Sequence, residues 1–263
     1  MVAPNLQKRL TKKQKRILKQ EGVLDKNSNY GPGFNPRSNI KPMTMNQRIA
    51  FEAWNRGSNL MLHGIAGTGK TFLAFHFAIK LLFTGNIRYK KIHVIRSTVP
   101  SRDMGFLPGS TRDKMRVYEG PYYDICSKLF DRGDAYDILK QRNNIEFLST
   151  SFLRGSTFDN CIIIVDEVQN MNDMELHTIM TRVGENCRII FCGDVKQDDL
   201  TSERYKETSG LAQFMKIIRN MKEFQFVEFI KEDIFNQDGK ATEQQKKDIA
   251  TLQARLKKLR AKK

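Results

Sequence analysis

Short runs of apolar residues alternate with longer amphipathic stretches through the middle of the chain. The short runs are rich in Ile, Val, Leu and Phe, as buried strands are, and lie at 59–63, 91–96, 145–148, 161–165, 188–192 and 225–230. Between them we expect helices at 45–55, 69–83, 119–141, 173–182 and 208–221. Strands that alternate with helices predict an α/β fold, with a mostly parallel sheet covered by helices on both faces.

The two ends of the chain do not share this alternation. Residues 25–42 are rich in Asn, Gly, Pro and Ser, which predicts an irregular connector, and 11–20 could form a short basic helix capped by Thr11. The tail from Thr242 has the spacing of a capping box with Gln245, and its apolar residues form one helical stripe: Ile249, Leu252, Leu256 and Leu259. We therefore divide the chain into a basic segment with its connector (1–42), the α/β domain (43–235) and a basic helical tail (236–263). The tail's partner stays open between the domain, a neighbouring subunit and nucleic acid.

Most of the positive charge lies at the two ends. The net charge is +16; residues 1–20 hold seven Lys or Arg and no acid, and 240–263 hold nine Lys or Arg against two acids. The rest of the chain is therefore close to neutral. Basic ends on a near-neutral core favour a polyanionic partner, and we expect nucleic acid; the alternative is a pair of solvated, solubilising ends.

Several functional classes are disfavoured by what the chain contains. Its longest apolar runs have about five to seven residues, against roughly 20 for a membrane span, so we expect no membrane association. The first residues carry charge without an apolar stretch, so we expect no secretory signal and a cytoplasmic protein. The four cysteines show neither a CxxC pair nor zinc-ligand spacing, and Cys161 and Cys192 lie in strand-like runs as expected for reduced core thiols.

A glycine-rich loop between a predicted strand and a predicted helix carries the clearest chemistry. It matches G-x-x-x-x-G-K-[ST] at every fixed position: Gly64, Ile65, Ala66, Gly67, Thr68, Gly69, Lys70 and Thr71, followed by Phe72. Glycines let backbone N–H groups turn inward around phosphates, and the helix N-terminus adds partial positive charge. Lys70 can then reach the β- and γ-phosphates while Thr71 offers its hydroxyl to Mg²⁺. We assign nucleotide binding to these nine residues.

Two adjacent acids follow the apolar run 161–165. Acids at the carboxyl end of a buried strand lie beside the phosphate loop of an open α/β sheet, where ligands bind. We expect Asp166 to hold Mg²⁺ and Glu167 to polarise the attacking water as a general base. The alternative is a pair of surface acids that cap the next segment. A third strand-like run ends in Gly193-Asp194, where a polar side chain could face the γ-phosphate, although Gly-Asp is also an ordinary turn.

These residues together resemble a known family. Gly64–Thr71, the segment Asp-Glu-Val-Gln-Asn at 166–170 and Gly-Asp-Val-Lys-Gln at 193–197 are similar to motifs I, II and III of superfamily-one helicases. The chain more closely resembles the PhoH-like, phosphate-starvation-inducible ATPases, especially the short versions carried by bacteriophages. Further matching segments lie at 96–109, 149–155 and 181–184. The similarity covers about residues 42–234.

This resemblance implies one RecA-like P-loop domain that binds and hydrolyses ATP with Mg²⁺, and activity on single-stranded nucleic acid, with RNA helicase activity proposed for relatives. It also implies ring-like self-assembly as a hexamer and, for a phage protein, a location in the host cytoplasm. By the helicase pattern Gln47 would recognise adenine and Gln197 would sense the γ-phosphate. The loop 97–109 would lie where related motors touch a nucleic-acid backbone.

One position departs from the family. Relatives usually read Asp-Ile-Val-Arg near the end, where this chain reads Asp-Ile-Phe-Asn with Asn236 last. Arg154 and Arg182, both in family-matching segments, could instead supply charge to a neighbour's γ-phosphate; a structural ion pair is the alternative for each. Two other functional classes stay open: a nucleotide-dependent assembly switch that does not unwind nucleic acid, and a P-loop kinase, for which we identify neither lid arginines nor an acceptor pocket.

Overall fold

A computed structural model describes most of the α/β domain. The described residues are 34–37, 39–84, 88–97, 111–153, 155, 157–194 and 210–234. Several predicted features lie outside them: the basic helix at 11–20, the helical tail from Thr242, the loop 97–109 beyond Ser97, Arg154, Gln197 and Asn236.

The strands form one parallel sheet of six, in the order β3-β2-β4-β5-β1-β6. Each coincides with a predicted apolar run to within a residue or so, and their bounds are β1 Asn59–Gly64, β2 Lys91–Arg96, β3 Ile145–Ser149, β4 Cys161–Asp166, β5 Arg188–Gly193 and β6 Phe224–Phe229. All residues of β4 and of β5 are buried, as expected for strands covered on both faces. The predicted α/β fold with a parallel sheet is confirmed.

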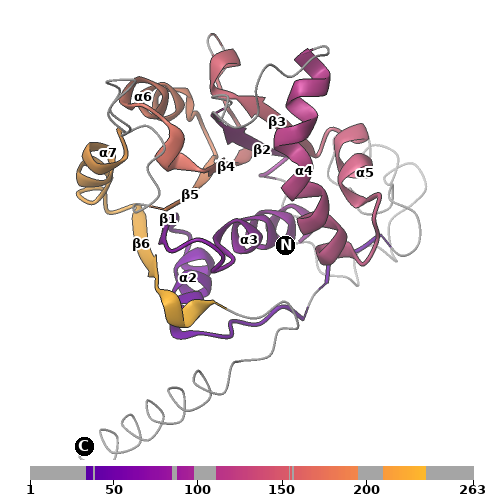
Figure 1. Cartoon of the computed structure of the whole chain (residues 1–263), viewed down its shortest axis with the longest axis horizontal. Helices are drawn as coiled ribbons and strands as arrows, with labels where there is room; N and C mark the ends of the chain where they lie inside the picture. The colour runs from indigo at the N-terminus through magenta and orange to yellow at the C-terminus, as the bar shows by residue number, and fades with distance from the viewer. Residues whose placement is uncertain are drawn as a thin grey trace, which may run out of the picture.

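Helices cover both faces of this sheet (Figure 1). One core cluster joins the sheet to α2 (Met45–Arg56), α3 (Lys70–Phe83), α4 (Thr111–Phe130) and α5 (Ala135–Gln141). The other joins the opposite face to α6 (Asp173–Arg182) and α7 (Leu211–Ile218). None of the described helices has the length and apolarity that crossing a membrane requires.

Two predictions about the α4 region are wrong. The helical stretch expected at 119–141 is two helices, because Asp131 adopts a left-handed backbone (φ 56°) that interrupts the helical ladder before α5 begins. The helix expected to begin at residue 119 begins earlier, since α4 starts at Thr111. Pro121 lies inside α4, although proline is usually found in the first turn of a helix. The Gly120-Pro121 pair therefore suggested a helix start where the helix in fact continues.

The end of the predicted connector packs on the domain. Phe34 is buried in the core, and its ring stacks on that of Phe130 with 4.5 Å between centroids. The Arg37 side chain forms an ion pair with Asp131. The backbone N–H of Arg37 donates to the carbonyl oxygen of Leu129 at 2.7 Å. These contacts hold the segment before α2 against the end of α4.

A buried arginine closes the end of α2. The Arg188 guanidinium lies over the Trp54 ring, 3.2 Å from its centroid, and donates to the carbonyl oxygens of Trp54 (2.9 Å) and Ser58 (2.5 Å). A cation at this position is favoured by the partial negative charge of a helix C-terminus. Burial lowers the pKa of Arg188 to about 10, so the side chain remains charged at neutral pH.

The cysteines are free thiols, and Cys161 and Cys192 are buried core residues as predicted. The Cys161 and Cys187 Sγ atoms lie 3.4 Å apart at the start of β4 and just before β5.

A buried histidine, His76, and a half-buried one, His93, make stability depend on pH. Burial lowers the pKa of His76, near Lys80, and of His93, near Glu146 and Lys91, to about 4 each. Between pH 6.5 and about 4 each of these two histidines therefore binds more protons in the unfolded chain than in the folded one. The free energy of unfolding should fall on acidification by up to about 1.4 kcal/mol per pH unit for each histidine.

Urea unfolding at several pH values between 7 and 4.5 measures this slope. His76→Phe should reduce it, because the ring lies between Phe51 and Phe77 and no longer titrates. His177→Gln, at an exposed position of α6, is the control and should leave the slope unchanged. An unchanged slope in His76→Phe would contradict the assignment.

Candidate functional site

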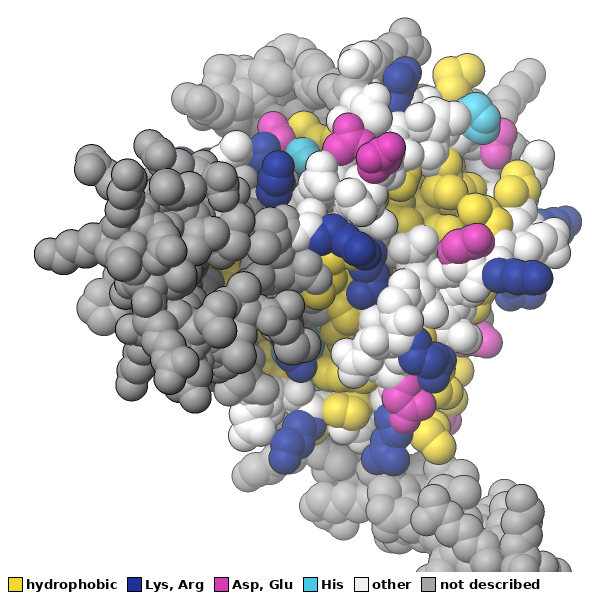
Figure 2. Space-filling view, turned by 180° about the vertical axis from the view of Figure 1, so that it is seen from behind, with side chains coloured by type: hydrophobic (Ala, Val, Ile, Leu, Met, Phe, Trp, Pro, Cys, Tyr) yellow, Lys and Arg dark blue, Asp and Glu magenta, His cyan; other side chains and the backbone are white. Residues whose placement is uncertain are grey.

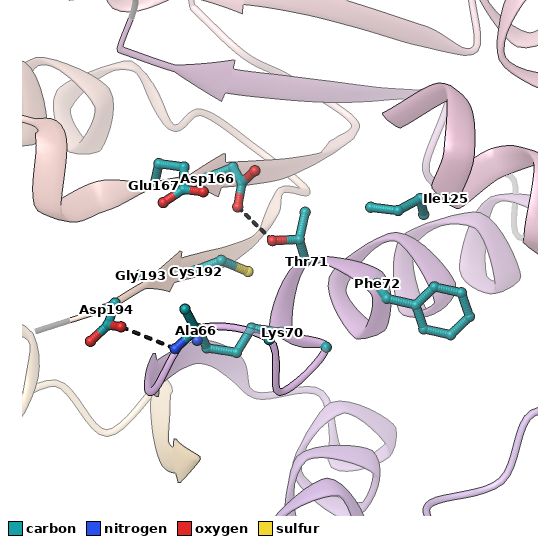
Figure 3. A pocket seen from close by; sticks show the side chains of 12 residues that line it. Ala66, Lys70, Thr71, Phe72, Ile125, Asp166, Glu167, Cys192, Gly193 and Asp194 are labelled. Carbon is teal, nitrogen blue, oxygen red and sulfur yellow. Dashed lines mark hydrogen bonds between the residues drawn. The ribbon is translucent and has the colours of Figure 1, made fainter. Parts of the chain in front are cut away.

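The carboxyl ends of β1, β4 and β5 meet at one edge of the sheet. The register pairs His63 of β1 with Gly193 of β5, so the residues after these strands lie side by side. An open cavity of about 330 Å³ lies at this edge (Figure 3). Its lining comes from the loop, α3, α4 and the ends of β4 and β5: Ala66, Gly67, Gly69, Lys70, Thr71, Phe72, Ile125, Asp166, Glu167, Cys192, Gly193 and Asp194.

The loop after β1 forms a cradle of backbone groups. Gly67 (φ 78°) and Gly69 (φ 82°) adopt the left-handed conformation that side chains disfavour, and a Cβ on either would project into open space. Gly69 is also the N-cap of α3, so the first free N–H groups of that helix face the same space. Backbone donors around an open concavity at a helix N-terminus form an anion site.

Lys70 holds its ammonium group at the mouth of this cradle. Its Nζ donates to the carbonyl oxygens of Gly64 at 2.8 Å and Ile65 at 2.7 Å. Burial lowers the pKa of Lys70, while Cys192, Asp194, Glu167 and Asp166 act to raise it. A buried ammonium group beside the backbone N–H groups of the loop complements the negative charge of a polyphosphate.

Asp166 is a buried carboxylate with donors on both oxygens. Thr71 Oγ1 donates to its Oδ1 at 2.8 Å, and Tyr122 of α4 donates from its hydroxyl to Oδ2 at 3.0 Å. Burial and the charge of Glu167 raise the pKa of Asp166, against the opposing effects of Thr71, Arg96 and Tyr122. The carboxylate thus joins β4 to α3 and α4.

Arg96 supplies positive charge behind the two acids. It is the last residue of β2 and lies opposite Asp166 in the register of β2 and β4. Its Nη2 is 4.0 Å from Glu167 Oε1. Burial acts to lower the pKa of Arg96, but Tyr122, Asp166 and Glu167 outweigh it and raise the pKa. Arg96 therefore balances the negative charge of the two acids.

Glu167 has an unusual backbone. Its φ of 54° and ψ of 48° are left-handed, which costs a residue with a Cβ about 1–2 kcal/mol. Such strain persists where surrounding contacts fix it, and it often occurs at functional sites. The Glu167 side chain lines the cavity (Figure 3). Gln169 Nε2 donates to its Oε2 at 2.5 Å.

Asp194 connects β5 to the loop. Its Oδ2 accepts from the N–H of Ala66 at 3.0 Å, and its own N–H donates to Gln169 Oε1 at 3.0 Å. Gln169 therefore bonds both Glu167 and Asp194. The polar side chain considered at this strand exit does line the cavity.

The structure places the sequence-predicted residues in two groups. Lys70, Thr71, Phe72, Asp166 and Glu167 lie together around the cavity, with most of the loop. Outside that lining, Gln47 is buried in the first turn of α2, where its Oε1 accepts from the Met43 N–H at 2.8 Å, and Arg182 ends α6.

Three residues in contact with the site were not assigned from the sequence: Tyr122, Arg96 and Gln169. Tyr122 lies inside a helix, 44 residues before Asp166 in the sequence, so no local pattern connects the two. Arg96 could have been found by placing β2 beside β4, because the register then sets it against Asp166. Gln169 lies two residues after Glu167 in the acidic motif. Its bonds to Glu167 and Asp194 depend on the conformation of the turn after Glu167, which the sequence does not reveal.

The residues present fit a nucleoside triphosphate with Mg²⁺. Thr71 and Asp166 bring two hard oxygen ligands together at the edge of the phosphate cradle. Mg²⁺ prefers a few protein oxygens, completed by water and phosphate oxygens. Across the described ranges, no three His, Cys, Asp or Glu side chains converge as a metal cluster.

Sequence comparison matches a family model described as PhoH-like protein over residues 39–244. The chain is 33% identical to the PhoH-like protein of Bacillus subtilis over 196 residues, which is 74% of this chain and 60% of that protein. It is 36% identical to protein PhoH2 of B. subtilis over 167 residues, covering 61% of this chain and 37% of the relative. Protein PhoH of Escherichia coli is 31% identical over 172 residues, covering 65% and 47%. The chain thus spans about half the length of these relatives.

Among solved structures, the chain is similar to the helicase domain of Pyrococcus furiosus Hef, with a TM-score of 0.42 and 13% identity, over 73% of this chain and 40% of that chain. Pif1 helicase from Candida albicans gives a TM-score of 0.33 and 15% identity, over 80% and 47%.

The bond from Tyr122 to Asp166 predicts a change in metal dependence. Tyr122→Phe keeps the ring but removes one of the two donors that orient the carboxylate. Outer hydrogen bonds of this kind are typically worth about 10- to 100-fold in metal affinity. The midpoint of a Mg²⁺ titration, followed by binding of a fluorescent ATP analogue, should rise by that order.

Tyr123→Phe is the matched control, since its hydroxyl bonds Asp137 on the surface. If both variants keep the wild-type midpoint, Tyr122 does not orient Asp166 for the metal.

Proposed function

This chain belongs to the PhoH-like protein family, a family of P-loop NTPases, and on that premise we propose that it is a Mg²⁺-dependent ATPase stimulated by single-stranded RNA. In its cells the protein would couple cycles of ATP binding and hydrolysis to its grip on one nucleic-acid strand. Helicase activity is the strongest form of this proposal.

One observation carries the ATPase proposal. The phosphate cradle with Lys70, the Thr71–Asp166 pair and Glu167 all face the same cavity. A binding site alone needs the cradle and a metal pair. A carboxylate held beside them in a strained backbone supports hydrolysis, because water activation needs a base near the terminal phosphate.

Each residue has a distinct part in this reaction. Loop N–H groups and the N-terminus of α3 bind the phosphate oxygens, and Lys70 exchanges loop carbonyls for phosphate oxygens. Thr71 and Asp166 would hold Mg²⁺, which neutralises phosphate charge when bound. Glu167 accepts a proton from the attacking water. Arg96 favours the ionised form of Asp166.

The nucleic-acid part of the proposal rests on the basic ends and on family resemblance. Figure 2 shows one face of the domain, where the described basic side chains are mixed with acidic and apolar ones. Such a face gives no continuous field of one sign. The excess charge belongs to residues 1–20 and 240–263, which supports tails as the main electrostatic contact.

A nucleotide-dependent assembly switch is the second candidate. Asn236 stands where relatives usually have arginine, and loss of a catalytic arginine would slow hydrolysis more than binding. Such a protein would bind Mg-ATP tightly, assemble, and turn over negligibly with or without RNA.

Substitution of the base separates binding from hydrolysis. Glu167→Gln should keep affinity for Mg-ATP and lose about 10²- to 10⁴-fold in kcat, because the amide cannot accept the water's proton. Steady-state phosphate release is measured with and without single-stranded RNA, alongside Glu223→Gln at an exposed position as control. RNA-stimulated turnover in the wild type supports the motor. Undiminished hydrolysis in Glu167→Gln would remove Glu167 from this role.

We further propose that the protein acts as a ring, a hexamer as in the family resemblance, with nucleotide at the interface between subunits. The described residues form one P-loop domain, and a neighbouring subunit could complete its site. Arg182 ends α6, away from its own cavity, and its Nε is buried without a hydrogen-bond partner among the described residues. Arg182, together with Arg154, is our candidate for the charge delivered to a neighbour's phosphate.

Arg182→Ala should lower kcat by about 10³- to 10⁵-fold if it is that finger, with nucleotide affinity and assembly retained. Light scattering with Mg-ATP reports the assembly, and Arg56→Ala, exposed at the end of α2, is the control. Unchanged turnover would eliminate Arg182, and a strictly monomeric ATP-bound protein would refute the interface.

A further inference from the structure

Gln169 occupies a buried position between the acidic motif and the end of β5. It is 2% exposed and lies in the short turn η5 (Val168–Asn170) directly after Glu167. Its side chain folds back to bond Glu167 at one end and the Asp194 backbone at the other. Both ends of a buried amide are thereby satisfied, which fixes its orientation.

The chemistry of the two partners dictates which way the amide faces. A backbone N–H can only donate, so the Asp194 N–H requires Gln169 Oε1. An ionised carboxylate only accepts, so Glu167 requires the Gln169 NH₂ group. The two requirements agree, and a flipped amide would lose both bonds.

The approach of this turn to β5 depends on a glycine. A Cβ at Gly193 would lie 2.3 Å from Val168 Cγ2 and 3.0 Å from Gln169 Oε1. Only glycine therefore lets the turn after Glu167 pack directly on the strand end. The contact between the two strand exits is built into the backbone.

The same connection reaches the phosphate loop. Asp194 is 7% exposed, and its carboxylate accepts from Ala66 while its N–H holds Gln169. Hydrogen bonds thus run without interruption from the loop, through the end of β5, to the carboxylate assigned as base. On its other oxygen Glu167 faces Arg96 at 4.0 Å.

We propose that Gln169 is the positioning residue of the general base: it holds the Glu167 carboxylate at the angle from which it meets the water, and ties that angle to loop 64–71 through Asp194. This inference rests on the proposed ATPase function. Gln169 is not among the residues that line the cavity, so it acts through Glu167. Its loss should lower kcat while KM and nucleotide affinity stay near wild type, because the cradle remains.

Gln169→Glu tests this most selectively. The new side chain has the same shape and can still accept from the Asp194 N–H, but it cannot donate to Glu167 and repels it. We expect kcat to fall about 10- to 100-fold, as for small misplacements of a reacting group, with KM and the Kd of a fluorescent ATP analogue within about twofold of wild type. Gln213→Glu, exposed on α7, is the matched control and should behave as wild type.

A swapped pair separates positioning from folding. Gln169→Glu should lower the Tm by about 2–4 °C through the repulsion. Combining it with Glu167→Gln restores a donor and an acceptor, so the Tm should recover while turnover stays absent. This recovery would show that the two side chains are bonded in solution.

Three outcomes would overturn the role of Gln169: a kcat within about twofold of wild type, a parallel loss of nucleotide affinity, or no recovery of Tm in the swap. Absence of turnover in the wild-type protein is distinguishable from these. It would refute the proposed ATPase and, with it, any positioning of a base.

Discussion

A buried carboxylate at the end of β4 governs how the domain is arranged. Asp166 lies away from water, so its charge must be met by donors and cations from several elements. Thr71 comes from α3, Tyr122 from α4 and Arg96 from β2, and each reaches Asp166 only if its element packs in the observed place. The same constraint brings the phosphate loop, the acidic motif and α4 into one site. Chemistry and tertiary structure therefore depend on the same group.

Local patterns were sufficient for the strands and for the first layer of the site. Six apolar runs became the six strands, since a strand buried on both faces must be apolar throughout. The loop 64–71 and the pair at 166–167 carry their chemistry in adjacent residues, so spacing alone identified them. Their common cavity followed from a property of parallel sheets, whose carboxyl ends meet at one edge.

The features that could not be predicted from the sequence depend on how distant elements are arranged. The sequence does not distinguish Tyr122 from other core positions of a helix. Its bond to Asp166 can be recognised only once α4 is placed against β4. The break between α4 and α5 depends on Asp131, whose backbone adopts the left-handed conformation that residues with a Cβ disfavour. The contact of Gln169 with Asp194 requires both a reversed turn and a glycine across from it. In each case tertiary packing selects a conformation that neighbouring residues leave open.

The order of strands also has a consequence for biosynthesis. β1 carries the phosphate loop but lies between β5 and β6, the last two of the described strands in chain order. A nascent chain that has emerged only as far as β4 has the glycine-rich segment without either of its flanking strands. Pairings between such distant segments form slowly, because a long loop of chain must first be closed. The glycine-rich loop therefore gains both of its flanking strands only after translation has passed residue 229, which makes folding around this loop a late step of synthesis.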